Sequence, residues 1–195
     1  MSDTPRLRVV VAEDDAIIRM DLCQLLDEVG YDVVADCGQG DVAIDLIREH
    51  RPDAAVLDVK MPGLDGISAA SVISGERLCA VVLLTAFSQR TLIESARDAG
   101  VMAYLVKPFQ RDDLVPAIEL AVGRFAELVA LAEHSSSLEE QLAVRKLSDR
   151  AKARLMAEHS MTEDDAFRFL QRTAMDRRES LRKVAEDVLS GALEP

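Results

Sequence analysis

Short apolar runs alternate with helix-length amphipathic segments over the first 106 residues of the chain. Five such runs recur at intervals of roughly 20 to 26 residues. Strict alternation of strands and helices predicts a parallel sheet that is covered by helices on both faces and has right-handed crossovers. We therefore expect an α/β fold with strands at Leu7–Ala12, Asp32–Ala35, Ala54–Leu57, Ala80–Leu84 and Ala103–Val106.

Charged side chains follow three of these runs where each predicted strand ends. Glu13 and Asp14 follow the first run, Asp58 closes the third, and Lys107 follows the fifth. The carboxyl ends of parallel strands meet at one edge of the sheet, where ligands bind in open α/β folds. A nucleophilic carboxylate, an acidic pair and a lysine at that edge suit formation of an acyl phosphate on the aspartate.

The charge of the chain is distributed unevenly. Residues 1–139 hold 24 acidic and 12 basic side chains, whereas residues 140–195 hold 11 of each. All of the net charge of -12 therefore lies in the first part. A length of 195 residues is enough for two small domains.

Nothing in the sequence suggests secretion or a membrane. The N-terminus lacks the apolar segment of a signal peptide, and no uninterrupted apolar run approaches the ~18 residues of a membrane span. Cys23, Cys37 and Cys79 lack metal-site spacing. We expect reduced core cysteines in a cytoplasmic protein that has no membrane partner.

A helical pattern continues past the last predicted strand. It begins near Asp112, and a heptad-like seam follows over 126–142. We expect a long helix, or one with a soft point near Ser136, that pairs with a second chain; a solitary amphipathic linker is the alternative. The seam consists of Leu128, Leu131, Ser135, Leu138 and Leu142.

Residues 143–195 carry three further helical stripes, the last of which stops at Gly191. Three short helices in about 50 residues predict a small all-α bundle that depends on the preceding helix for part of its stability. The tail shows no motif of a hydrolase or kinase, so we do not expect an enzyme; at most, the protein catalyses its own phosphorylation and dephosphorylation.

Motifs follow the predicted strands in order: Glu13-Asp14-Asp15, Asp58 before Lys60-Met61-Pro62, Leu84-Thr85-Ala86 and Lys107-Pro108. Together they resemble the signature of two-component receiver domains over about residues 7–125. The resemblance implies a flavodoxin-like, doubly wound, five-stranded sheet in a domain of residues 1–125. It also implies that a sensor histidine kinase phosphorylates Asp58.

The same resemblance implies a magnesium site. Mg²⁺ prefers oxygen ligands, so Asp14 and Asp58 are the natural direct ligands, with Glu13 acting directly or through water. The family also supplies a backbone carbonyl, which falls here on Lys60. Taken singly, an acidic pair at a strand end could equally be a solvated loop.

Three further residue roles are implied by the family. Lys107 pairs with a phosphoryl oxygen, Thr85 donates a hydrogen bond to another, and Tyr104 swings inward as the switch. The Lys107–Pro108 peptide is expected to be cis. Phe87, two residues after Thr85, suggests a long-lived acyl phosphate. Individually, Lys107 could form a surface ion pair, Thr85 could simply end a strand, and Tyr104 could be a core aromatic.

The tail contains Ala151-Lys152-Ala153-Arg154-Leu155-Met156, then Met161-Thr162-Glu163-Asp164-Asp165-Ala166-Phe167. Over roughly 139–190 it resembles the ANTAR domain, an RNA-binding module of antitermination regulators, here within 143–195. RNA readers use lysine and arginine for phosphate contacts. The candidate RNA-binding residues are Arg150, Lys152, Arg172, Arg177 and Arg178; a solvated basic face is the alternative for each.

Both resemblances together imply a response regulator. Its phosphorylated form would dimerise, bind RNA hairpins and promote transcription antitermination. The alternative is a phosphorylation-gated module whose helical tail binds a partner protein. A DNA-binding output is less favoured, because the tail has no net positive charge for nonspecific duplex binding.

Overall fold

The structure, a computed structural model, describes the backbone of residues 6–86 and 90–195, and their side chains except 90–93 and 135–139. Within these residues, five parallel strands form one sheet in the order β2-β1-β3-β4-β5. The predicted α/β fold is confirmed. The strands are β1 (Arg8–Ala12), β2 (Asp32–Cys37), β3 (Ala54–Asp58), β4 (Ala80–Thr85) and β5 (Ala103–Val106).

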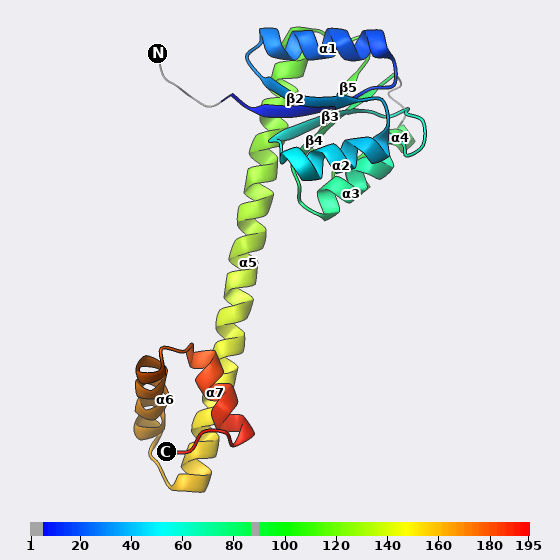
Figure 1. Cartoon of the computed structure of the whole chain (residues 1–195). Helices are drawn as coiled ribbons and strands as arrows, with labels where there is room; N and C mark the ends of the chain where they lie inside the picture. Colours follow the sequence, from blue (N-terminus) through cyan, green and yellow to red (C-terminus); the bar gives the residue numbers. More distant parts are fainter. Residues whose placement is uncertain (1–5, 87–89) are drawn as a thin grey trace. The chain divides into compact units, whose positions relative to one another are not determined.

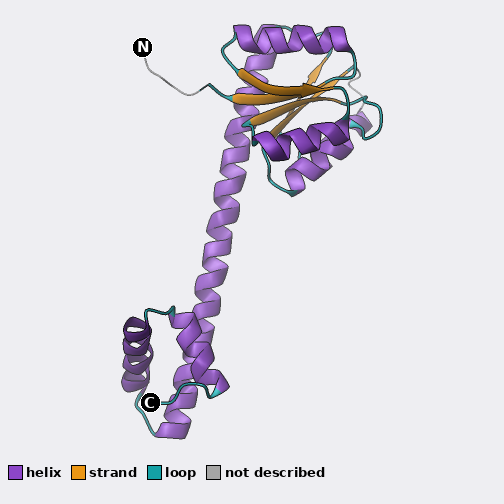
Figure 2. Ribbon diagram, in the orientation of Figure 1, coloured by secondary structure: helices purple, strands orange, loops and turns teal. Residues whose placement is uncertain are grey.

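Helices cover both faces of the sheet (Figures 1 and 2). Alternate side chains of a strand point to opposite faces, so each strand contributes to two cores. Val9 and Val11 belong to the core on the face that α1 and α5 cover, whereas Val10 and Ala12 belong to the core on the face that α2 and α3 cover. The helices are α1 (Ala16–Glu28), α2 (Gly40–His50), α3 (Gly66–Gly75), α4 (Arg90–Asp98) and α5 (Arg111–His159).

The chain divides into two compact units, Met1–Ala130 and Leu131–Pro195. The division falls inside α5, which continues without a break through the predicted limits at 125/126 and 142/143. The predicted linker and the first helix of the tail are therefore one helix. Of the described helices, none is both long and apolar enough to span a membrane.

The second unit packs the C-terminal part of α5 against α6 (Glu163–Arg177) and α7 (Leu181–Ser190). Each of the two shorter helices begins at a hydroxyl cap, Thr162 for α6 and Ser180 for α7, which accepts a backbone N–H of the first turn. The core is small and consists mainly of Ala151, Leu155, Ala166, Leu170, Val184, Ala185 and Val188.

Gly66 brings the start of α3 against the end of β3. A Cβ at this position would overlap the backbone carbonyl of Asp58, whereas a Cβ at exposed Gly123 in α5 would meet nothing within 4 Å. We expect Gly66→Ala to lower the free energy of unfolding by about 1–3 kcal/mol. Gly123→Ala should raise it by about 0.5–1 kcal/mol. Urea unfolding followed by circular dichroism measures both, and a neutral Gly66→Ala would contradict this packing.

Candidate functional site

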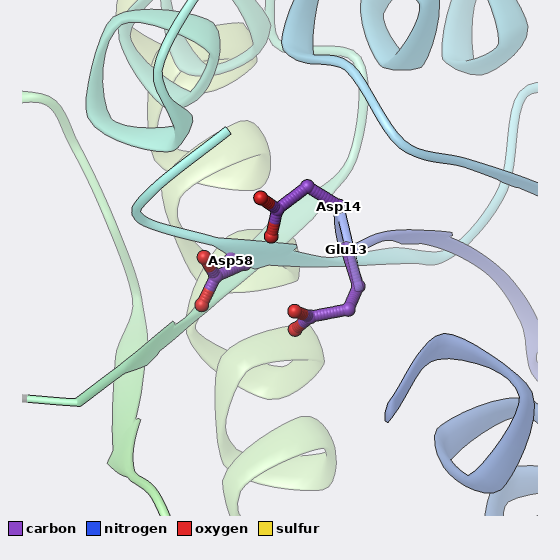
Figure 3. A group of neighbouring side chains, drawn as sticks. All are labelled: Glu13, Asp14 and Asp58. Carbon is purple, nitrogen blue, oxygen red and sulfur yellow. The ribbon is translucent and has the colours of Figure 1, made fainter. Parts of the chain in front are cut away.

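Three carboxylates gather at the carboxyl edge of the sheet (Figure 3). Glu13 and Asp14 follow β1, and Asp58 ends the neighbouring strand β3. The crossover from β1 to β2 runs to one side of β1, and the one from β2 to β3 returns to the other side, so this edge is the topological switch point. Carboxylate oxygens of the three residues lie within 4.8 Å of one another.

The carboxylates belong to a cavity of about 650 Å³. Its walls come from the ends of β1, β3 and β4 and from the segment after β5, which is why residues distant in sequence meet there. The sequence-predicted residues that line it are Glu13, Asp14, Asp58, Lys60, Thr85 and Lys107.

Lys107 forms ion pairs with two of these acids. Its Nζ lies 2.5 Å from Glu13 Oε2 and 2.6 Å from Asp58 Oδ1. The Glu13 side chain is only 2% exposed and that of Asp58 only 8%. One half-buried ammonium thus pairs with two buried carboxylates, and nearby Asp14 adds a further negative charge.

This imbalance of charge is reflected in the pKa values. Burial by itself lowers the pKa of Lys107, but hydrogen bonds to Asp58 and Glu13 outweigh burial and raise it. Burial raises the pKa of Glu13; the hydrogen bond from Lys107 offsets only part of this, and the charge of Asp58 raises it further. The site therefore keeps its lysine protonated and holds excess negative charge, which favours a bound cation.

Local backbone geometry orients two of the acids. The backbone N–H of Lys60 donates to Asp58 Oδ2 at 2.8 Å, so each oxygen of Asp58 has a hydrogen-bond donor. Asp15 serves a different purpose from Asp14, because its carboxylate caps α1 by accepting the N–H groups of Ile17 and Ile18.

The donor set fits a hard divalent cation. All three side chains supply carboxylate oxygens, the ligands that Mg²⁺ prefers, and Asp14 is exposed on the open side of the cavity. Receiver domains bind Mg²⁺ at an acidic pocket of this kind, so the predicted cofactor is consistent with the site. The backbone of Lys60 lies in the same cavity wall.

The remaining predicted receiver residues differ in their position. Thr85 is buried at the end of β4 and lines the cavity. Tyr104 in β5 is 43% exposed and lies outside that lining, so it is not a core aromatic here. The Lys107–Pro108 peptide is cis, as predicted. Phe87 lies outside the described residues.

Arg19 is a positioning residue that we did not predict from the sequence. Its Nη1 donates to the carbonyl of Glu13 at 2.6 Å, and its Nε donates to Asp36 Oδ2 at 2.9 Å. The guanidinium therefore joins the loop after β1 to the end of β2. The only available sequence signal was a basic residue one helical turn after Asp15.

Arg19→Ala is expected to lower the free energy of unfolding by about 1–3 kcal/mol, because its bonds are charge-assisted and partly buried. Arg6→Ala is the control, since Arg6 and Asp27 are both largely exposed and 3.7 Å apart; its effect should stay within about 0.5 kcal/mol. Unfolding in guanidinium chloride measures the stability of both variants. If Arg19→Ala and Arg6→Ala lowered the free energy of unfolding equally, the positioning role of Arg19 would be excluded.

In the second unit, Lys152 is engaged within the protein. Its Nζ lies 2.9 Å from carboxylate oxygens of Asp149 and Glu163, and 5.9 Å from the ring centroid of Phe167. The Lys152 side chain is only 16% exposed. Glu163 and Phe167 belong to α6, so Lys152 links α6 to α5.

The other four predicted RNA contacts are surface residues. Arg172 lies 3.7 Å from Asp176, and Arg177 lies 4.0 Å from Asp187. Arg150 and Arg178 are exposed and form no ion pair with another described residue. The five side chains thus do not form a single cluster of free charge.

Both units of the chain match known protein families. The model of the response regulator receiver domain matches residues 9–119, and that of the ANTAR domain matches residues 136–189. The signal receiver domain of the response regulator NarL from Mycobacterium tuberculosis superposes with a TM-score of 0.59 at 30% identity, covering 62% of this chain and 98% of that one.

Two curated relatives agree with this assignment. The chemotaxis protein CheY of Bacillus subtilis is 33% identical over 112 residues, which are 57% of this chain and 93% of that protein. The transcriptional regulatory protein PdtaR of Mycobacterium tuberculosis is 56% identical over 182 residues, which are 93% of this chain and 89% of that protein. The match to PdtaR covers both domains of this chain, and PdtaR is a transcriptional regulatory protein, in agreement with the regulatory role that we predicted for this chain. The chain therefore belongs to the response regulators of transcription that join a receiver domain to an ANTAR domain.

Proposed function

We propose that phosphorylation of Asp58 by a sensor histidine kinase switches on RNA binding by the ANTAR domain. The bound RNA hairpins then promote transcription antitermination in the cytoplasm. The observation that carries this proposal is the buried Asp58 carboxylate, which is held by Lys107 and by the Lys60 N–H at the end of β3, in a chain that also matches the ANTAR family. The proposed domains are 1–125, 126–142 as linker, and 143–195.

Asp58 is suited to act as the nucleophile. One carboxylate oxygen attacks the phosphorus of the donor phosphohistidine, the P–N bond breaks, and its electron pair leaves with the imidazole. The new P–O bond makes an aspartyl phosphate. Lys107 then pairs with a phosphoryl oxygen, and the Thr85 hydroxyl donates to another.

Phosphoryl transfer needs neutralisation of charge more than covalent assistance. Asp14, Asp58 and the backbone carbonyl of Lys60 would hold Mg²⁺, with Glu13 binding directly or through water. When bound, the ion supplies positive charge to the phosphoryl oxygens. Without it, the excess of carboxylates opposes the approach of a phosphate.

The signal would leave the receiver domain through Thr85 and Tyr104. Movement of the Thr85 hydroxyl toward the phosphoryl group vacates space, and the half-exposed ring of Tyr104 can then turn inward. Homodimerisation follows through the seam of α5, where Leu128, Leu131 and Leu142 are exposed. A dimer would present two ANTAR domains to paired hairpins and so gain avidity.

The test measures RNA affinity of the purified full chain with and without acetyl phosphate and Mg²⁺. The RNA is a pool of two-hairpin molecules with randomised loops. We expect at least tenfold tighter binding after phosphorylation, and no change for Asp58→Asn, which keeps the shape but removes the nucleophile. Asp98→Asn, at an exposed acid in α4, should behave as wild type.

Two results would contradict the proposal. Equal RNA binding with and without the phosphodonor would exclude gating by Asp58. If no RNA binds in either state, a partner protein becomes the target of the helical tail.

A further inference from the structure

Most cationic side chains of the second unit are bound to acids of the same unit. The acidic partner already neutralises part of the charge of each such cation, so the ion pair must open before the cation can interact fully with an anionic ligand. Arg145, Lys146, Arg150 and Arg178 are exposed and have no ion-pair partner among the residues whose side chains are described. The paired cations are Lys152, Arg154, Arg168, Arg172, Arg177, Arg182 and Lys183.

Three of the four unpaired cations are close together on α5. Lys146 and Arg150 are four residues apart, so they lie on one face about one turn, or 6 Å, from each other. Ala153 and Ala157 continue this row with the same helical spacing, and all four residues are exposed. Arg145 is turned about 100° round the helix from Lys146 and lines a cavity with Asp149 and Lys152, so it borders the row on one side. We call Arg145, Lys146 and Arg150 the cationic face.

Lys146 and Arg150 lie away from the core of the second unit. Ala151 and Leu155, which α5 buries against α6 and α7, project from the other side of the helix. No acidic residue occurs in the row formed by Lys146, Arg150, Ala153 and Ala157. Two small side chains next to two cations leave a flat surface that a bulky polyanion can approach closely.

We propose that the cationic face binds the phosphate backbone of the RNA. This inference rests on the proposed function and assigns the contact to specific residues, two of which, Arg145 and Lys146, were not among our sequence candidates. An RNA strand brings regularly spaced negative charge, which unpaired cations at one-turn spacing complement. A second copy of the chain that packed symmetrically through the same face would instead place like charges against it.

Lys152 has a different role in this scheme. Its ammonium joins Asp149 on α5 to Glu163 on α6 and lies over Phe167. It therefore holds the two helices together and contributes little free charge to a ligand. Its loss should affect the stability of the bundle more than the salt dependence of RNA binding.

The test uses the full chain, phosphorylated with acetyl phosphate in Mg²⁺, and RNAs selected by the wild-type protein from the randomised two-hairpin pool. Affinity is measured from 50 to 300 mM salt. The variant is the triple substitution Arg145→Gln, Lys146→Gln and Arg150→Gln. Its control removes the same charge elsewhere, by Arg168→Gln, Arg182→Gln and Lys183→Gln. Lys152→Met is measured beside them.

We expect the cationic-face variant to bind on the order of 10- to 100-fold more weakly at 150 mM salt. The slope of log affinity against log salt should fall by about 2, since three phosphate contacts are lost. The control should change affinity less than about threefold. Lys152→Met should keep the wild-type slope and lower the melting temperature of the second unit. Circular dichroism of the cationic-face variant should remain that of wild type, because its three side chains are exposed.

Each contrary outcome has a distinct meaning. If the wild type binds RNA and the cationic-face variant binds it equally well, the inference fails and the proposed function stands. The same holds if only the oligomeric state changes, which would mark this face as a contact between copies. If the wild type selects no RNA, the proposed function and the inference fail together.

Discussion

Lys107→Ala is expected to lower the free energy of unfolding by about 3–5 kcal/mol at pH 7 in magnesium-free buffer. Lys107 provides the ammonium that is hydrogen-bonded to both Glu13 and Asp58. Its removal leaves two buried carboxylates close together without a counter-charge, in a site that already has excess negative charge. Mg²⁺ should restore part of the lost stability, because the cation would occupy the same acidic cavity.

The pH dependence follows from the raised pKa of Lys107. A group whose pKa is raised by folding contributes its stability below its unfolded pKa and loses it as the pH rises through the folded value. The difference between wild type and Lys107→Ala is therefore complete at pH 7 and closes only at strongly alkaline pH.

Urea unfolding at pH 7 and in alkaline buffer, each with and without Mg²⁺, tests this expectation. Lys60→Ala is the matched control, since it removes an exposed lysine side chain from the same cavity but keeps the backbone groups that contact the site. Its effect should stay within about 1 kcal/mol. Equal stability of wild type and Lys107→Ala in the absence of Mg²⁺ would show that Lys107 does not balance the carboxylates.

Leu170→Ala should unfold the ANTAR bundle while leaving the receiver domain intact. Leu170 is fully buried on α6 in a core of few side chains. The resulting cavity costs about 2–5 kcal/mol, a large share of the stability of so small a bundle. We therefore expect loss of RNA binding together with normal phosphorylation of Asp58.

Two readouts separate the domains. Phosphorylation is followed by the shift of the phosphoprotein on a phosphate-affinity gel, and folding of the helices by circular dichroism at increasing temperature. Met175→Ala is the control on the same helix, because Met175 is 79% exposed. If Leu170→Ala also abolished phosphorylation, the two units would not fold independently.

The local pattern of the sequence was sufficient to locate the strands and the reactive groups. Successive side chains of a strand, about 3.3 Å apart along the chain, alternate between the two faces of the sheet, and a strand that is buried on both faces is apolar throughout. The end of an apolar run in the sequence therefore marks the end of the strand. The ends of the apolar runs therefore predicted that Asp58, Glu13, Asp14 and Lys107 meet at one edge of the sheet, and they line one cavity there.

The partners of those groups could not be predicted from local pattern. Lys107 and Glu13 are 94 residues apart in the chain, and their contact depends on how β1, β3 and β5 are ordered in the sheet. Arg19 is similar, because its role arises from the end of β2 lying beside the loop after β1. The sequence alone cannot reveal such contacts, since it contains many oppositely charged residues and only the fold decides which of them lie next to each other.

The RNA-binding candidates show the same limit. Arg150 and Lys152 look equivalent in sequence, yet packing of α6 against α5 neutralises Lys152 with Glu163 and leaves Arg150 unpaired. Periodicity was enough to predict the strand positions, and short motifs carried the resemblance to the two domain families, because both are properties of short stretches of chain. Which charges stay unpaired depends on the packing of the helices, because packing decides whether an acidic residue from a distant segment of the chain lies next to a given cation.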